Sequence, residues 1–204
     1  MAKLAFYTYG ILEETKGRPH SKGFIDRVPD VFESAERSDG FIDRDRARSR
    51  EDASLAWGDP DASPRYTKEQ WLAQTGDSTV SPIILTGPDS YEAATLSLWD
   101  DLESVYAFAY NGRHFEALKK RAEWFVKPEW PTYVAWWVED GETPTREDAA
   151  GRLEHLHDKG STPHAFDFKT PFDASGTPWK MDRPKIQEHA KTVKEFDEDN
   201  PKDY

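Results

Sequence analysis

Residues 133–138 read Tyr-Val-Ala-Trp-Trp-Val, a run of aromatic and β-branched side chains that Pro131 precedes and Asp140-Gly141 follows. This composition is typical of a β-strand, and it offers no charged side chain to solvent. Residues 4–9 and 94–99 alternate like strands as well, and two shorter strands are expected at residues 40–42 and 165–168. The sequence therefore predicts a sheet whose strands lie far apart along the chain.

Between these strands, apolar residues recur at the spacings of amphipathic helices. The expected helices cover residues 24–35, 102–109, 113–126 and a segment that follows Thr143-Pro144 and ends at Gly160. Pro29 falls inside the first of them. Because a proline removes one backbone hydrogen bond, we expect a kink there or two short helices.

The order of these elements predicts an α+β fold, a ferredoxin-like βαββαβ antiparallel sheet with its helices on one face. Such a sheet leaves its second face open, yet Tyr7, Tyr9, Trp136 and Trp137 provide no polar face. A partner subunit, an insertion or the C-terminal tail must then cover that second face. We expect a homodimer.

Residues 1–172 are expected to form one domain with an insertion at about residues 49–90, which is rich in Asp, Ser, Pro and Gly. The aromatic residues of the insertion favour a packed flap, either a lid or a passive cover. Residues 173–204 are charged and contain proline, so they predict a C-terminal extension that wraps a neighbour.

The composition excludes several classes of partner. The 204 residues include 27 basic and 39 acidic side chains, a formal net charge of −12 that repels nucleic acid and anionic lipid. The chain has no Cys, so disulfides and thiolate chemistry are excluded. No apolar run reaches the ~18 residues of a membrane span, and no signal peptide is recognisable. We expect a cytoplasmic protein with no nucleic-acid or membrane partner.

Several segments together resemble a known family: His114-Phe-Glu-Ala-Leu-Lys-Lys-Arg121-Ala-Glu-Trp124-Phe125, Trp136-Trp137-Val138, Pro144-Thr145 with Glu147, Arg152-Leu153, and Gly160-Ser-Thr162-Pro163-His-Ala165-Phe166-Asp-Phe168. Their combination resembles a domain-of-unknown-function family of the dimeric α/β-barrel superfamily. The resemblance implies the fold and the dimer but transfers no catalytic residue. Relatives in the superfamily include cofactor-free oxygenases, lactone isomerases, polyketide-type cyclases and haem-binding proteins, which use the cavity between sheet and helices.

The expected helix 113–126 carries the candidate catalytic residues. His114, Arg121 and Trp124 would share one face of it. An imidazole with a pKa near ~6.5 can move a proton at neutral pH, and a guanidinium can hold a carboxylate or an enolate oxygen. His114 and Arg121 are therefore candidate catalytic residues, with Tyr110 orienting the substrate. In the alternative, His114 caps the break after Asn111-Gly112, and Arg121 pairs with a surface acid.

Five aromatic residues are candidates for lining a substrate cavity: Tyr106, Trp99, Trp124, Tyr133 and Trp137. The alternative is an ordinary aromatic core and dimer interface. His155 and His157 do not predict a metal site, because residues two apart on a helix point in different directions.

These residues predict a cofactor-free acid–base enzyme that acts on a hydrophobic, aromatic or polyketide-like small metabolite. The reaction would be a cyclisation, an isomerisation, an elimination or an O₂-dependent oxidation. The alternative is a non-catalytic protein that binds haem or a hydrophobic metabolite, with His114 as the ligand.

Overall fold

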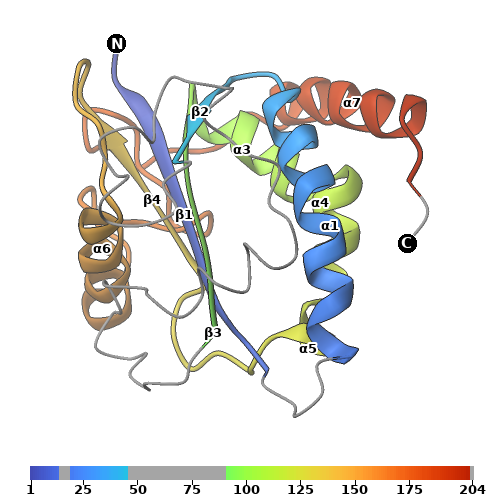
Figure 1. Cartoon of the computed structure of the whole chain (residues 1–204). Helices are drawn as coiled ribbons and strands as arrows, with labels where there is room; N and C mark the ends of the chain where they lie inside the picture. The colour runs from blue at the N-terminus through green and yellow to red at the C-terminus, as the bar shows by residue number, and fades with distance from the viewer. Residues whose placement is uncertain (14–18, 46–90, 203–204) are drawn as a thin grey trace.

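The computed structural model describes residues 1–13, 19–45 and 91–202 (Figure 1). The whole of the expected insertion, residues 49–90, lies outside the described residues, so its roles as lid or cover stay predictions.

The core of the protein is one antiparallel sheet of four strands. The strands are β1 (Lys3–Leu12), β2 (Phe41–Arg44), β3 (Tyr91–Trp99) and β4 (Tyr133–Val138), in the order β2-β3-β1-β4. The predicted α+β class and antiparallel sheet are confirmed.

The predicted last strand, residues 165–168, is wrong as a strand. The segment forms two isolated bridges, one between Phe166 and Ala135 at the outer edge of β4 and one between Ala165 and Thr162. The chain turns away directly afterwards, because the side chain of Asp167 accepts hydrogen bonds from the backbone of Lys169 and Thr170.

The helices of the described residues are α1 (Pro19–Glu36), α3 (Leu102–Ala109), α4 (Gly112–Lys119), α5 (Arg121–Trp124), α6 (Arg146–Lys159) and α7 (Arg183–Asp199). Helix α1 continues through Pro29, so the division into two short helices is wrong. The ring of Pro29 is exposed, and on a solvent-facing side water can satisfy the carbonyl that the proline leaves without a partner.

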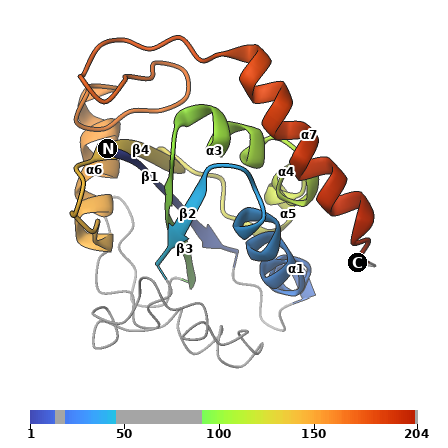
Figure 2. The ribbon, with the colours of Figure 1, turned by 90° about the horizontal axis from the view of Figure 1, so that it is seen from above.

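Helices cover both faces of the sheet, which corrects the prediction of helices on one face (Figure 2). Leu4 and Phe6 of β1 pack in a cluster with residues of α1 and α3. Tyr7 and Tyr9, on the opposite face, belong to a cluster with Ala149, Leu153 and Leu156 of α6. The helical periodicity of residues 146–159 predicts an apolar stripe but not the face that it covers. Helix α6 therefore covers the face for which a partner subunit was expected.

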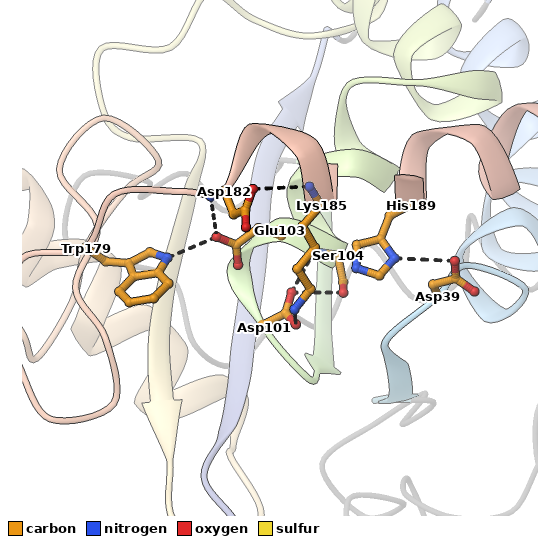
Figure 3. A network of polar contacts seen from close by, with 8 residues as sticks. All are labelled: Asp39, Asp101, Glu103, Ser104, Trp179, Asp182, Lys185 and His189. Carbon is orange, nitrogen blue, oxygen red and sulfur yellow. Dashed lines mark hydrogen bonds and ion pairs between the residues drawn. The ribbon is translucent and has the colours of Figure 1, made fainter. Parts of the chain in front are cut away.

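The C-terminal extension contacts its own chain through buried charges. The side chains of Arg113 on α4 and Asp197 on α7 are 7% and 9% exposed, and Nε lies 3.3 Å from Oδ1. The carboxylate of Glu103, a residue only 3% exposed, accepts hydrogen bonds from Trp179 Nε1 at 3.0 Å and from the backbone N–H of Asp182 at 2.8 Å (Figure 3). Polar groups on α3 and α4 thus fix the start and the end of α7.

A substitution of Gly112 tests this docking. Gly112 has a φ of +54°, and a Cβ there would collide with Asp197 Oδ2 and lie 2.9 Å from Val193 Cγ1. Gly112→Ala should lower the free energy of unfolding by about 2–4 kcal/mol, measured by urea denaturation. The matched control is Gly151→Ala within α6, where a Cβ meets nothing within 4 Å and should stabilise by about 0.5–1 kcal/mol. Equal effects of the two substitutions would contradict the docking role of Gly112.

Candidate functional site

A cleft of about 540 Å³ lies between the segment that leads into β4 and the loop that follows α6. The residues of its wall that matter below are Arg121, Trp130, Tyr133, Leu156, Asp167 and Lys169. Two of the predicted site residues, Arg121 and Tyr133, are among them. The cleft therefore combines an apolar surface with both signs of charge.

Asp167 is the carboxylate of this cleft, and its own hydrogen bonds hold it in place. Its Oδ1 accepts from the Ser161 hydroxyl at 3.2 Å and from the backbone N–H groups of Lys169 and Thr170 at 2.9 and 3.0 Å. Within the described residues, Oδ2 has no hydrogen bond. Asp167 is not among the site residues predicted from the sequence, although a charged residue between Phe166 and Phe168 is a visible signal.

Arg121 is exposed and forms no ion pair with any described residue. The alternative prediction named Glu116, Glu123 or Asp148 as its partner; none of these acids forms an ion pair with Arg121 in the described structure, and two of them are engaged elsewhere. Glu116 binds Lys119 at 2.6 Å, and Asp148 forms the capping box of α6 with Thr145. The guanidinium of Arg121 is thus available to a ligand in the cleft.

Two phenols connect the cleft to the interior. The hydroxyl of Tyr133 accepts from the backbone N–H of Phe168 at 3.3 Å and donates to the hydroxyl of Tyr110. Burial raises the pKa of both phenols, and the hydrogen bond that it donates raises that of Tyr133 further. The ring of Tyr106 lies 4.6 Å from that of Tyr110. The two phenols stay protonated at neutral pH, so they do not act as bases.

His114 lies apart from this group and does not line the cleft. The predicted helix 113–126 is divided at Lys120 into α4 and α5, so a face shared by His114 and Arg121 is wrong. Lys120 N–H donates to the Ala117 carbonyl, three residues before it, which ends α4.

The position of His114 fits the capping alternative. Its Nδ1 donates to the carbonyl of Ala109 at the end of α3, at 2.8 Å, and its ring lies 4.8 Å from that of Phe108. Burial lowers the pKa of His114.

The three tryptophans proposed for the cavity have structural contacts. Trp99 packs between Phe41 and Phe108 in the core. Trp124 packs against Phe24, and Arg27 lies over its ring. The half-buried Trp137 donates its Nε1–H to the carbonyl of Phe172 at 2.8 Å. The structure thus brings Arg121, Tyr133, Tyr110 and Tyr106 together and leaves Trp99, Trp124, Trp137 and His114 elsewhere.

Two further observations apply to the residues that the structure describes. They contain no group of three or more His, Asp or Glu side chains that could hold a metal ion. None of their helices has both the length and the apolar composition needed to cross a membrane.

The lowered pKa of the partly buried His114 predicts a pH dependence of stability. Below its ordinary pKa of 6.5 the unfolded chain binds a proton that the folded chain refuses until the lower folded pKa is reached. The melting temperature should therefore fall as the pH falls from about 7.5 to about 5.5. His114→Gln keeps a donor for the Ala109 carbonyl and removes the group that titrates. The melting temperature of this variant should therefore fall less over the same pH range. A loss as large as that of the unaltered protein would show that other groups cause the dependence.

The profile of a known family matches most of the chain. The sequence profile described as "Domain of unknown function (DUF3291)" matches residues 3–183. No curated protein and no solved structure matches the chain. The matched range includes the sheet, α1, the cleft and α6, and it ends at the first residue of α7. The chain belongs to the DUF3291 family of domains of unknown function.

Proposed function

We propose that this protein is an acid–base enzyme that moves a proton on a hydrophobic small molecule bound in the cleft. The observation that carries the proposal is the presence of Asp167, Arg121 and Tyr133 on the wall of one cleft. Apolar contact comes from Trp130 and Leu156 on the same wall.

Each polar group has a distinct role in the proposal. Oδ2 of Asp167 takes a proton from a carbon next to a substrate carbonyl, because Oδ1 is already held by its three donors. Arg121 stabilises the negative charge that develops on the substrate oxygen. The ring of Tyr133 packs against the substrate, since its hydroxyl proton is already donated to Tyr110, which does not line the cleft. A cyclisation, an isomerisation or an elimination on an aromatic or polyketide-like metabolite starts with this step, and so does a cofactor-free oxidation by O₂.

Asp167 replaces His114 as the proton-moving group of the proposal, because His114 does not line the cleft and its Nδ1 is engaged with Ala109. The alternative, a non-catalytic protein that binds haem through His114, stays a prediction that no observation here favours. A Soret band that appears on haem addition and is lost in His114→Ala would support it.

We also propose that this fold is related to a known superfamily. The strand order β2-β3-β1-β4, with α1 between β1 and β2 and α3 to α5 between β3 and β4, supports a ferredoxin-like βαββαβ arrangement. That arrangement supports membership in the dimeric α/β-barrel superfamily. The homodimer stays a prediction, and light scattering would test it.

Hydrogen exchange at carbon tests the proposed chemistry without knowledge of the substrate. In D₂O, the protein should speed the exchange of the acidic C–H groups of 2-tetralone, a bicyclic benzylic ketone, as followed by NMR. Asp167→Asn should slow this exchange by the ~10²–10⁴-fold typical of a lost general base. The amide oxygen still accepts from Lys169 and Thr170, so the loop should keep its shape.

A second aspartate provides a matched control. Asp173 also holds a turn through Oδ1, which accepts from the backbone of Ser175 and Thr177 at 2.9 Å, and it does not line the cleft. Asp173→Asn should exchange 2-tetralone at the unaltered rate. An Asp167→Asn variant that is as fast as the control would exclude Asp167 as the base.

A further inference from the structure

The charge of the cleft is opposite to that of the protein. The chain has a formal net charge of −12, yet the charged side chains that line the cleft are Arg121, Lys169 and Asp167, a local sum of +1. A concave surface with this excess raises the local concentration of anions. The binding of a neutral hydrophobic substrate does not require this excess of positive charge.

Lys169 has no other evident role in the described structure. Its ammonium group forms no ion pair with a described residue, whereas its backbone N–H donates to Asp167 Oδ1 at 2.9 Å. The turn that positions the carboxylate of Asp167 therefore also positions the start of the Lys169 side chain. A cation whose backbone is held two residues from the proposed base is suited to bind one end of a ligand.

The cleft also contains a donor that lacks an acceptor. Nε1 of Trp130 is buried, and no described residue accepts its hydrogen bond. A buried N–H without an acceptor is unfavourable, because it has lost its hydrogen bond to water. Because this N–H is closed to solvent, a ligand oxygen in the cleft becomes its acceptor only if the Trp130 ring turns toward the cleft.

We propose that the ligand of this cleft is an aromatic carboxylate, with its carboxylate bound by Lys169 and the Trp130 indole N–H. The inference rests on the proposed function, in which Arg121 serves the oxygen of the reacting carbonyl. Two cations then divide two tasks: Lys169 binds a charge that is present throughout, and Arg121 binds a charge that develops during the reaction. The aromatic body of the ligand lies against Leu156 and Tyr133.

Calorimetric titration with two probes of nearly equal shape tests this proposal. The protein should bind 2-naphthoate about tenfold more tightly than the neutral 2-naphthamide, and added salt should reduce the difference. Lys169→Gln should abolish the preference for the anion. The matched control is Lys120→Gln, an exposed lysine next to Arg121 that does not line the cleft, and this variant should keep the preference. Circular dichroism of both variants confirms their folding.

The binding results test the carboxylate assignment independently of the proposed proton transfer. Equal binding of the two probes, or an unchanged preference in Lys169→Gln, overturns the carboxylate assignment even if 2-tetralone exchange depends on Asp167. Preference for 2-naphthoate that Lys169→Gln removes supports the assignment even if no exchange is seen, and the cleft is then a binding site for aromatic anions without the proposed proton transfer.

Discussion

The central strand β1 has apolar side chains on both of its sides, and the rest of the structure depends on this constraint. Leu4 and Phe6 face one way and Ala5 and Tyr7 the other, all at most 5% exposed. Burying such a strand requires a layer on each face. Helices α1 and α3 form one layer and α6 the other. The chain must therefore pass from one side of the sheet to the other after β4. Its return over the edge of β4 places Phe166 beside Ala135 and forms one wall of the cleft.

The extension beyond the family match is held by a different kind of contact. Helix α7 contributes few apolar residues to its docking, with Ala190 and Val193 as the buried ones. Buried polar pairs, such as Arg113 with Asp197, replace them. Pairs of this kind add little net stability, because both groups lose their hydration, but a misplaced partner leaves a buried charge unpaired and is costly. The contacts therefore specify one position of α7 on α3 and α4.

The cleft is built by local turn chemistry at the edge of the sheet. The Asp167 side chain turns the chain after the bridge at Phe166, and the same carboxylate then lines the wall. The phenols of Tyr133 and Tyr110 join this edge to the core behind it. Asp167 thus holds the turn and is also the candidate base. This double use explains how a short loop can present a carboxylate at a fixed place.

The sequence by itself determined the α+β class, the strands near residues 4–9, 94–99 and 133–138, and most helices, because alternation and helical spacing are local patterns. It also selected Arg121, Tyr110 and Tyr133. Only the tertiary structure decided which face α6 covers, since an apolar stripe does not name its partner. It also separated His114 from Arg121, because the break at Lys120 interrupts an otherwise continuous helical pattern. The place of Asp167 on the cleft wall required the fold as well, because its turn brings residues 160–170 against residues 128–133, a contact between segments that no local pattern encodes.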